Sequence, residues 1–521
     1  MHLSLYLSRW ARERPDQPAI AFGDEVLRWG DYDRRAGALA AHLASLGVAA
    51  GDRVGCLLGN GLDWCVAFAA AVKLGAIFVP LNNLFGPFEL RQIAESADCA
   101  AIISAPALVG KLRSPGGAND GRGERQSEDL GVVIYDWGSG TAPVALADIG
   151  ADGDVPQLDA SDDDVLLISY TSGTTGRPKG AMLTHAGVEA MTRNMALAFD
   201  MADNERFLIL APLAFTGGVV SNLAPVIILG AQAWLEASVD PARALNLLHE
   251  HRISMLAGVP ALWQRIAEAP GFAQAELAGL RGATGGAPVP LPLLQAYNAK
   301  GVRIRQQYGF TEACGCVSSP DEAAALARPE ACGRPLPGME LELRDAAGQP
   351  AAPCEVGEIH ARGRQLMKGY WRDTEATQAA FDGDWYRTGD LGRWNAAGEL
   401  MIMDRKKSML ISGGVNVYPA EVERAMGTIE GVVEVAVFGL ESRTWGDEVV
   451  AVAHAPNIAD PALIIAAARD LLGPYKTPKQ VRLSPTPLAR TVSNKIARAG
   501  LAELWNALGD PASNAARNGC P

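Results

Sequence analysis

The loop from Thr171 to Gly180 constrains the fold and chemistry of this chain more than any other segment does. It follows the apolar run 165–168, which predicts a buried strand, and it precedes residues 181–185, which predict a second strand. Between the two strands lie four hydroxyl residues, three glycines and Lys179. Glycines let backbone N–H groups approach a ligand closely, and hydroxyls and a lysine add donors and positive charge. The sequence therefore predicts a loop that binds nucleotide phosphates.

This loop differs from the Walker-type phosphate loop, which has the pattern G-x-x-x-x-G-K-[ST] at the start of a helix. Here Pro178 takes the place of the second glycine, and Gly180 follows Lys179. Pro178 also lacks an N–H group and disfavours helix at Arg177. The alternative to a phosphate loop is a flexible hairpin tip rich in small residues.

Length and charge limit the classes of protein to which the chain can belong. Its 521 residues exceed what one hydrophobic core usually supports, so we expect two or more domains. Hydrophobic residues make up 48% and charged residues 20%, which is typical of globular proteins. The net charge of −13 argues against general nucleic-acid binding, and no basic run is interleaved with aromatic residues. We therefore expect no nucleic-acid partner.

The cysteines and the chain start favour a reducing, cytoplasmic location. The eight cysteines show no C-x-x-C spacing, and a chain of this size needs no disulfides. Cys314 and Cys316 have no Cys or His pair nearby, so we expect packing residues and not a metal site. The first residues lack the basic start and the apolar stretch of a signal peptide.

The longest apolar stretch, residues 64–81, contains Lys73 and the helix breakers Gly75 and Pro80. A membrane span needs a longer uninterrupted apolar run. We therefore predict a buried helix followed by a strand, and no integral membrane association.

Two parts of the chain, from Leu27 to about 150 and from Val165 to about Phe310, alternate helices with short buried strands. This alternation predicts parallel α/β sheets, with the second part forming a second sheet layer. The elements that we expect are helices over 31–46, 241–251 and 261–268, strands over 54–58 and 255–256, and a polar surface loop over 116–129. From Leu336 to Met403, short strands such as 339–343 and 357–361 predict a compact β unit with few helices.

The charged run from Asp404 to Lys407 predicts a linker, and a solvated turn within one domain is the alternative. After it the sequence predicts helices over 420–426 and 461–472 and strands over 432–439 and 449–454. About a hundred residues are enough for a small α+β domain, which we place at 408–505. Residues 506–521 are small and polar, and we expect them to form a disordered tail.

Several further motifs follow the phosphate loop in a fixed order. They are Gly285–Pro288, Tyr308–Glu312, Gly357–Ile359, Tyr386–Asp390, Asp404–Lys407, Ser412–Glu423 and Arg490–Lys495. In this order and spacing, they closely resemble the adenylate-forming superfamily of acyl-CoA synthetases, luciferases and adenylation domains that load carrier proteins. The resemblance covers essentially the whole chain, and its specificity comes from the concurrence of all the motifs.

The resemblance implies an α/β fold with a large N-terminal AMP-binding domain over 1–403. This domain would contain two α/β sheets and a β-barrel at about 336–403. A hinge at 404–407 would join it to a small mobile α+β C-terminal domain.

The resemblance also implies a two-step reaction. A carboxylate attacks the α-phosphate of ATP, pyrophosphate leaves, and a thiol then displaces AMP from the acyl-adenylate. Both steps concentrate negative charge, so positioned cations and N–H donors should carry most of the catalysis. The expected cofactors are ATP, Mg²⁺ and coenzyme A as co-substrate, and the expected partner is a small carboxylic acid.

The resemblance assigns roles to individual residues. Lys495 matches the lysine that bridges the carboxylate and the α-phosphate, and Glu312 matches the Mg²⁺ ligand. Together with Thr311, these two residues are the catalytic candidates. Nucleotide binding falls to the phosphate loop, the residues flanking adenine and two residues near the ribose: Thr171, Ser172, Gly173, Thr174, Thr175, Gly176, Lys179, Gly286, Ala287, Tyr308, Asp390 and Arg405. The remaining candidates are Ser412, Gly413 and Gly414 for the CoA tunnel, Phe215, Gly218, Val219, Gly309, Ala313 and Cys314 for the acyl pocket, and Lys407 for the hinge.

The chain departs from the family pattern at three positions. Asn494 stands where the family usually has glycine, and asparagine tolerates positive φ best among the other residues. Ser408 replaces the usual acidic residue after the hinge, and Phe215 replaces a gate histidine found in many relatives. The pocket candidates are small or apolar, and Gln307 stands where malonate-activating relatives have arginine. An uncharged acyl group is therefore favoured over a dicarboxylate.

The leading hypothesis is an AMP-forming acid:CoA ligase for a medium-chain, alicyclic or aromatic monocarboxylic acid. One alternative is a stand-alone enzyme that loads an acyl carrier protein. Another is a catalytically silent nucleotide- or acyl-binding homologue. The sequence leaves a homodimer open.

Overall fold

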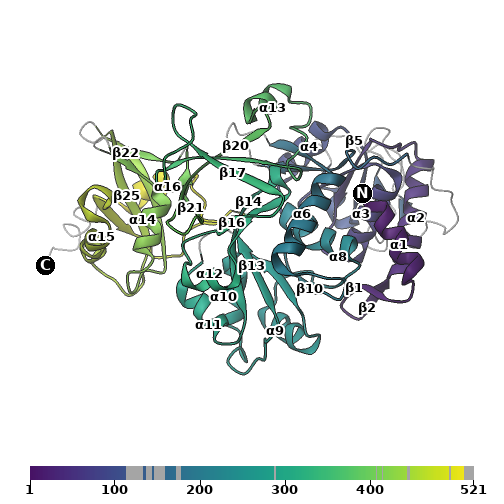
Figure 1. Ribbon diagram of the computed structural model, residues 1–521, viewed down its shortest axis with the longest axis horizontal. Helices are drawn as coiled ribbons and strands as arrows, with labels where there is room; N and C mark the ends of the chain where they lie inside the picture. The colour runs from purple at the N-terminus through teal and green to yellow at the C-terminus, as the bar shows by residue number, and fades with distance from the viewer. Residues whose placement is uncertain are drawn as a thin grey trace. The chain divides into compact units, whose positions relative to one another are not determined.

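The computed structural model describes residues 1–112, 133–135, 144–145, 159–171, 178–286, 289–406, 408–412, 415–442, 446–491 and 495–509 (Figure 1). The chain forms two compact units, each of which makes most of its contacts within itself. The first unit consists of Met1–Leu341 and Ala361–Tyr386, and the second consists of Glu342–His360 and Arg387–Pro521. In the described part of the chain, no helix combines the length and the apolar character needed to cross a bilayer.

The first unit contains a seven-stranded sheet with the order β7-β6-β5-β3-β4-β8-β9. Its strands are β3 (Arg53–Leu57), β4 (Ile77–Pro80), β5 (Cys99–Ser104), β6 (Val133–Tyr135), β7 (Val144–Ala145), β8 (Val165–Thr171) and β9 (Lys179–Thr184). Strands β5, β3, β4 and β8 pair in parallel, while β8 and β9 form an antiparallel hairpin around the predicted phosphate loop.

A second, nine-stranded sheet has the order β16-β15-β14-β13-β12-β10-β11-β1-β2. Its strands are β1 (Pro18–Phe22), β2 (Glu25–Arg28), β10 (Arg206–Ile209), β11 (Gln232–Leu235), β12 (Met255–Gly258), β13 (Arg281–Gly285), β14 (Arg303–Phe310), β15 (Gly315–Ser319) and β16 (Arg334–Pro335). The pairs from β1 through β14 along this order are parallel, and the outer pairs are antiparallel.

Two parallel α/β sheets are therefore confirmed, but their predicted division along the chain is wrong. Strands β8 and β9 complete the first sheet, although the sequence placed everything from Val165 onward in the second. Strands β1 and β2 join the second sheet through the β1–β11 pair. The predicted strand 181–185 also ends one residue early, because the Thr184 side chain accepts a hydrogen bond from the Gly187 N–H (3.0 Å) and caps a helix that starts at His185.

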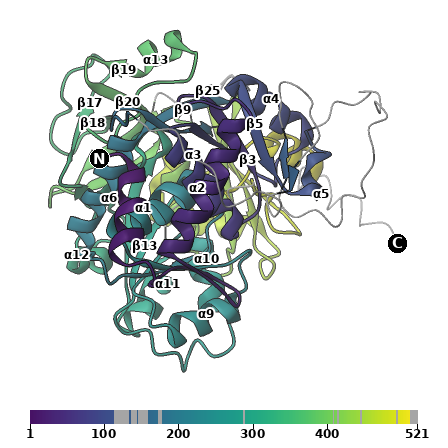
Figure 2. The same ribbon diagram turned by 90° about the vertical axis from the view of Figure 1, so that its right-hand side faces the viewer.

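The helices before β8 are α1 (Leu3–Glu13), α2 (Trp29–Ser45), α3 (Leu62–Leu74), α4 (Pro87–Ala97) and α5 (Pro106–Val109). Figure 2 shows α1, α2 and α3 packed side by side. Helix α3 is buried along nearly its whole length, and Gly75 ends it with a φ of 72° before β4 begins. The predicted buried helix and strand at 64–81 are thus confirmed.

The helices between β9 and β16 are α6 (His185–Phe199), α7 (Thr216–Gly218), the π-helix η2 (Val219–Leu223), α8 (Ala224–Leu229), α9 (Pro241–Glu250), α10 (Pro260–Ala267), α11 (Leu291–Asn298), the 3₁₀ helix η3 (Thr311–Ala313) and α12 (Glu322–Ala327). Helix α9 starts at Pro241 because the Asp240 side chain accepts from the N–H groups of Ala242 and Arg243.

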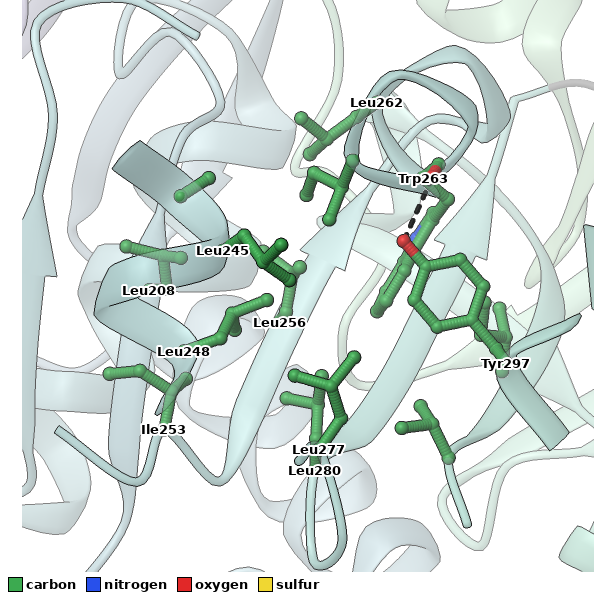
Figure 3. Packing of buried hydrophobic residues seen from close by; sticks show 14 of the residues in the cluster. Leu208, Leu245, Leu248, Ile253, Leu256, Leu262, Trp263, Leu277, Leu280 and Tyr297 are labelled. Atoms are coloured by element: carbon green, nitrogen blue, oxygen red, sulfur yellow. Dashed lines mark hydrogen bonds between the residues drawn. The ribbon is translucent and has the colours of Figure 1, made fainter. Parts of the chain in front are cut away.

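A large hydrophobic cluster joins helices α9, α10 and α11 to strands β10, β12 and β14 (Figure 3). Trp263 is fully buried at its centre, and its ring meets that of Tyr297 edge to face at 5.0 Å. The Tyr297 hydroxyl donates to the Trp263 carbonyl oxygen (2.8 Å), and the Trp263 indole N–H donates to the Ala283 carbonyl oxygen (3.3 Å). The Tyr297 hydroxyl and the Trp263 indole N–H therefore both have hydrogen-bond partners inside the core.

A five-stranded sheet follows, with the order β17-β18-β20-β19 and with β21 paired to β20. Its elements are β17 (Met339–Arg344), β18 (Gly357–Gly363), α13 (Thr374–Ala380), β19 (Phe381–Asp382), β20 (Trp385–Trp394) and β21 (Leu400–Arg405). The predicted β unit is confirmed, with α13 as an added helix. Closure of this sheet into a barrel remains a prediction, because the pairs found among the described residues do not join its ends.

The C-terminal residues form an α+β structure in the second unit, as predicted. Its strands have the order β23-β22-β25-β24, with β26 paired in parallel to β25. The elements are β22 (Leu410–Ser412), β23 (Val415–Val417), α14 (Pro419–Met426), β24 (Glu434–Ser442), β25 (Gly446–His454), α15 (Pro461–Lys476), β26 (Gln480–Leu483) and α16 (Leu501–Leu508). The predicted loop 116–129 and the predicted tail from Asp510 onward lie outside the described residues, whereas residues 506–508 of that predicted tail form the end of α16.

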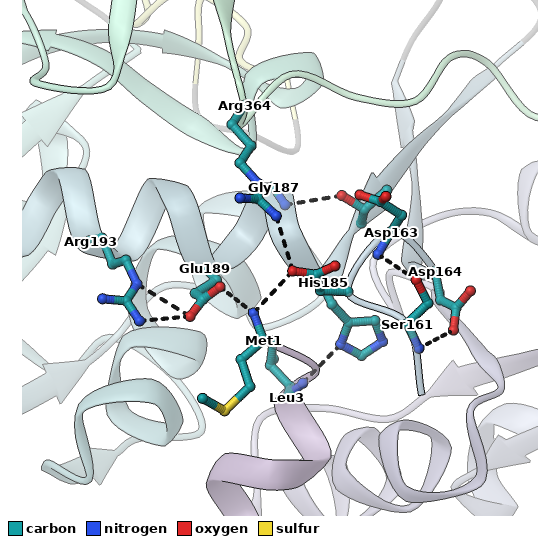
Figure 4. Close-up of polar contacts among 12 residues, drawn as sticks. Met1, Leu3, Ser161, Asp163, Asp164, His185, Gly187, Glu189, Arg193 and Arg364 are labelled. Carbon is teal, nitrogen blue, oxygen red and sulfur yellow. Dashed lines mark hydrogen bonds and ion pairs between the residues drawn. The ribbon is translucent and has the colours of Figure 1, made fainter. Parts of the chain in front are cut away.

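A polar cluster ties the N-terminal amine to helix α6 (Figure 4). The Met1 ammonium pairs with Glu189, which also accepts from Arg193 (2.9 Å) and from the Tyr6 hydroxyl. Burial alone raises the pKa of Glu189, but the Met1 amine, Tyr6 and Arg193 together lower it to about 2. Burial lowers the pKa of His185, whose ring accepts from the Leu3 N–H (3.1 Å), to about 2. This histidine is therefore neutral and structural at physiological pH.

Trp263→Ala tests the cluster of Figure 3. The substitution removes a fully buried ring and leaves the Ala283 carbonyl oxygen without its indole N–H donor, so the free energy of unfolding should fall by about 3–5 kcal/mol. The measurement is the shift of the urea unfolding transition. Leu197→Ala is the control, because that side chain is 72% exposed on α6 and its loss should change stability by only about 0.5 kcal/mol. Equal shifts for the two variants would contradict the assignment of Trp263 to a core.

Candidate active site

The β8–β9 hairpin holds the ends of the predicted phosphate loop in register. Thr171 lies opposite Lys179, and its hydroxyl donates to the Lys179 carbonyl oxygen (3.4 Å). The Lys179 ammonium lies 5.3 Å from the ring centroid of Tyr370, a cation–π contact. The loop candidates Ser172, Gly173, Thr174, Thr175 and Gly176 lie outside the described residues.

A tight turn between β14 and β15 presents Glu312. Thr311, Glu312 and Ala313 form the one-turn helix η3, and Cys314 ends it with a φ of 56°. Gly309 is required just before this turn, because a Cβ there would lie 2.1 Å from the Gly315 carbonyl oxygen. The Glu312 side chain therefore projects from a compact, sterically defined hairpin.

Two tyrosines connect Glu312 to the phosphate-loop hairpin. The Tyr370 hydroxyl donates to Glu312 Oε1 (2.9 Å) and lies 3.3 Å from the Tyr386 hydroxyl. Burial, followed by the Glu312 charge, raises the pKa of both phenols, so both are neutral hydroxyls at physiological pH. The Tyr386 ring also stacks on Phe310 at 5.2 Å. The structure thus places Glu312 and Lys179 around one shared residue, Tyr370.

The chain segment that carries Tyr370 fixes both hairpins. The fully buried Gln365 amide donates to the carbonyl oxygens of Ala313 (2.8 Å) and Cys316 (2.7 Å). On the other side, the segment makes backbone hydrogen bonds with β9, including Trp371 N–H to the Gly180 carbonyl oxygen (2.7 Å). Sequence reasoning missed Gln365 and Tyr370, and no local pattern marks a residue whose role is to join two distant hairpins.

The adenine-binding candidates occupy the ends of neighbouring strands. Tyr308 lies near the end of β14, is nearly buried, and has its ring 5.8 Å from that of Phe310. Gly286 follows β13 and has a φ of 84°, which favours glycine. Ala287 lies outside the described residues.

The acyl-pocket candidates belong to two segments of the first unit. Phe215 precedes α7, whose Thr216 hydroxyl is hydrogen-bonded to Ser169 of β8 (2.7 Å). Gly218 is required there, since a Cβ would lie 2.1 Å from the Pro212 carbonyl oxygen. The turn beside η3 comes close to η2, because a Cβ built on Gly315 would meet the Ser221 hydroxyl at 2.8 Å. Of the remaining candidates, Val219, Ala313 and Cys314 are buried, and Gly309 is exposed.

The second unit brings three charged candidates into one neighbourhood. Asp390 on β20 lies directly opposite Arg405 on β21, with Oδ1 3.3 Å from the guanidinium Nε. Lys495 lies close enough to both for their charges to act on it. Burial, followed by the Arg405 charge, lowers the pKa of the Lys495 ammonium, and the Asp390 charge partly opposes this effect. The ribose candidates and the catalytic lysine candidate are therefore neighbours in this unit.

The CoA-tunnel and hinge candidates are only partly described. Ser412 ends β22, and its hydroxyl is buried with no hydrogen-bond partner among the described residues. Gly413, Gly414 and Lys407 lie outside the described residues.

Six of the seven described cysteines are buried, and Cys354 is exposed. Cys314 and Cys316 are buried, and burial raises the pKa of both thiols. The seven described cysteines are free, and nowhere in the described ranges do three His, Cys, Asp or Glu side chains gather as a metal cluster.

Comparisons with known proteins agree with this geometry. The family model "AMP-binding enzyme" matches residues 7–371, and the model "AMP-binding enzyme C-terminal domain" matches residues 421–495. A feruloyl-CoA synthase from an Amycolatopsis species is 34% identical over 94% of this chain and 96% of its own length. A long-chain-fatty-acid–CoA ligase from Mycobacterium tuberculosis is 33% identical over 93% of this chain and 94% of its own.

Solved structures give the same result. The o-succinylbenzoate CoA synthetase from Bacillus subtilis has been solved with its acyl-adenylate intermediate, and that structure matches with a TM-score of 0.82 and 25% identity over 97% of this chain and 98% of its own. The same enzyme solved with ATP and a magnesium ion matches with a TM-score of 0.81 and 25% identity over 95% of this chain and 99% of its own. The predicted superfamily, fold class and enzyme class are confirmed, and the chain belongs to the AMP-binding enzyme family, among the AMP-forming acyl- and aryl-CoA ligases.

Proposed function

We propose that the chain is an ATP-dependent carboxylic acid:CoA ligase that works through an acyl-adenylate and acts on an aromatic, alicyclic or medium-chain monocarboxylic acid whose acyl group carries no further charge. The observation that carries this proposal is the grouping of Lys179, Tyr370 and Glu312 beside the ends of the phosphate loop. A cation and a carboxylate at fixed positions are what the phosphates of ATP and their metal ion require.

Glu312 fits a magnesium site. Mg²⁺ usually keeps several waters and binds through one or two carboxylates together with substrate phosphates. Glu312 is half-buried, and its Oε1 accepts from a neutral hydroxyl, so its negative charge is not neutralised by Tyr370. Glu312 would hold the ion, which would offset negative charge on the phosphate oxygens. The proposed role of Lys179 and the loop from Thr171 to Gly176 is to bind the pyrophosphate part of ATP.

The second unit would serve the nucleoside and the reacting carboxylate. In our proposal, the Asp390 carboxylate accepts from the ribose hydroxyls, which is a charge-assisted pairing, and Arg405 lies near the same group. Lys495 then offsets the charge that develops between the attacking carboxylate and the α-phosphate. Its proximity to Asp390 and Arg405 supports this assignment. Tyr308, Gly286 and Ala287 are proposed to flank the adenine.

The remaining assignments stay proposals from the sequence. They are the CoA tunnel at Ser412, Gly413 and Gly414, the hinge at Lys407, and the boundary between domains at 404–407. The two family models end at 371 and begin at 421, on either side of this hinge. The homodimer, the cytoplasmic location and the absence of a nucleic-acid partner likewise remain predictions.

The substrate class rests on the acyl-pocket candidates. Phe215, Val219 and Cys314 offer an aromatic ring, a branched aliphatic chain and a thiol that burial keeps protonated. Gln307 replaces a cation, and its amide contacts the Met195 sulfur at 3.4 Å. The feruloyl-CoA synthase and the fatty-acid ligase are named for monocarboxylic acids, and the o-succinylbenzoate CoA synthetase is named for a dicarboxylic acid.

A carboxylic-acid panel tests the proposal. We expect aromatic or medium-chain monocarboxylates to release pyrophosphate from ATP, dicarboxylates to release little, and CoA to yield the thioester. Pyrophosphate release followed by transfer only to a holo-carrier protein would favour the carrier-loading alternative. A protein that binds ATP but releases no pyrophosphate with any acid would be the silent homologue.

Lys495→Ala separates the two steps. Because Lys495 is proposed to act on the α-phosphate, the variant should lose acyl-AMP formation by about a hundredfold or more and keep thioester formation from supplied acyl-AMP. Lys300→Ala removes a lysine that donates to the Ala273 and Ala275 carbonyl oxygens, and it should leave both steps unchanged. Equal losses in both steps of the Lys495 variant would count against the assignment.

Tyr370→Phe tests the link between Lys179 and Glu312. The variant keeps the ring under Lys179 but removes the hydrogen bond to Glu312, so the Mg²⁺ concentration that gives the half-maximal rate of acyl-AMP formation should rise by about tenfold or more. Tyr297→Phe is a matched control, because it removes a buried hydroxyl that donates to the Trp263 carbonyl oxygen in a different core. An equal rise of the half-maximal Mg²⁺ concentration in both variants would contradict the proposed role of Tyr370.

A further inference from the structure

Lys495 lies at the end of a short hairpin in the second unit. The Thr491 N–H donates to the Lys495 carbonyl oxygen (2.7 Å), the Lys495 N–H donates to the Thr491 hydroxyl (3.2 Å), and Arg490 forms an isolated antiparallel bridge with Ile496. A further backbone hydrogen bond runs from the Ala497 N–H to the Ala489 carbonyl oxygen (2.8 Å). These bonds join the two described sides of the hairpin, residues 489–491 and 495–497, to each other and not to the rest of the domain.

An ion pair attaches the C-terminal side of this hairpin. The Arg498 guanidinium donates to both carboxylate oxygens of Glu423 on α14, each at 2.9 Å, and to the Val437 carbonyl oxygen on β24 (2.9 Å). Glu423 in turn accepts from the Val437 N–H (2.8 Å). Arg498 therefore joins the hairpin to a helix and a strand at once, in a geometry that only a planar guanidinium provides.

A second ion pair attaches the N-terminal side. Arg490 pairs with Glu434 at the start of β24, and the same carboxylate accepts from the Leu488 N–H (2.6 Å). Between the two ion pairs, Ile496 packs against the cluster that contains Leu488 and Trp505. The residue after Lys495 is thus held by apolar contacts, and the hairpin is anchored at three places.

These anchors matter because a lysine side chain is a flexible four-carbon stem that does not fix its own ammonium. A displacement of about 1 Å from the productive geometry can reduce a rate about a hundredfold. The position of the Lys495 backbone therefore largely determines where the Lys495 ammonium group can lie.

We propose that Glu423 and Arg498 are positioning residues for Lys495: with Glu434 and Arg490, they hold the hairpin that carries the lysine and so set the rate of acid adenylation, not that of thioester formation. This inference rests on the proposed function of Lys495. The contacts involve α14 and β24, neither of which carries a residue assigned to the nucleotide. The role is therefore positional and not catalytic.

Arg498→Met tests the inference, because it keeps the aliphatic stem and removes all three hydrogen bonds of the guanidinium. Single-turnover acyl-AMP formation should slow by about tenfold or more, with little change in the ATP concentration needed for half saturation. Conversion of supplied acyl-AMP to acyl-CoA should stay within about twofold of wild type. Arg498→Lys keeps the charge and should recover part of the loss.

The ion pair between Glu421, on α14 like Glu423, and Lys476, at the end of α15, provides a matched control. Lys476 donates to both oxygens of Glu421 (2.7 and 2.8 Å), but this pair does not contact the hairpin of Lys495. Lys476→Met should therefore leave acyl-AMP formation unchanged. Burial raises the pKa of Glu423 and Arg498 opposes this effect, so the loss of Arg498 lets this carboxyl group take up a proton instead of keeping an unpaired charge.

Equal losses in both half-reactions of Arg498→Met, or no loss in either, would overturn the positioning role. Retention of thioester formation in the variant shows at the same time that it has folded. A wild-type protein that forms no acyl-AMP with any acid would instead overturn the proposed function, which keeps the two failures distinguishable.

Discussion

The buried amide of Gln365 is the contact on which the first unit's charged groups depend. Its Nε2 donates to the carbonyl oxygens of Ala313 and Cys316, and its Oε1 accepts from Asn194 on α6 (2.7 Å). If this fully buried amide lost these partners, the free energy of unfolding would fall by about 1–3 kcal/mol for each polar group left without a hydrogen bond. The turn that carries Glu312 is therefore fixed to helix α6 and to the chain leading to Tyr370, and its carboxylate keeps one position relative to Lys179.

Much of this arrangement could be predicted from local sequence. The strand before the phosphate loop is a run of apolar residues starting at Val165, and the buried helix and strand at 64–81 show the expected breakers at Gly75 and Pro80. The motif series also groups Asp390, Arg405 and Lys495, which are neighbours in the second unit, while their roles stay predictions. These features depend on residue type and spacing, which a sequence displays directly.

The rest could not be predicted, because it depends on contacts between distant segments. Sheet membership is one case, since β8 and β9 join the first sheet through a parallel crossover pairing with β4 that no local pattern specifies. Tyr370 is another case, because a hydroxyl aimed at Glu312 has no periodicity that would distinguish it from a packing tyrosine. The start of α6 is a different case, because Thr184 is a local N-cap signal, and this signal outweighs the apolar pattern that predicts a strand through residue 185.

The two units hold their charged groups by different physical means, and the difference suits the proposed chemistry. Among the described residues, Glu312 is held by the neutral Tyr370 hydroxyl, which positions the carboxylate without competing with a cation for its charge. Lys495 makes no ion pair with a described residue, and the Arg–Glu pairs beside it neutralise one another at the base of its hairpin. Each group is thus fixed through contacts that leave its own charge for a ligand, as electrostatic catalysis requires. In both units, the charged candidate residue is held in place by contacts that do not neutralise its charge.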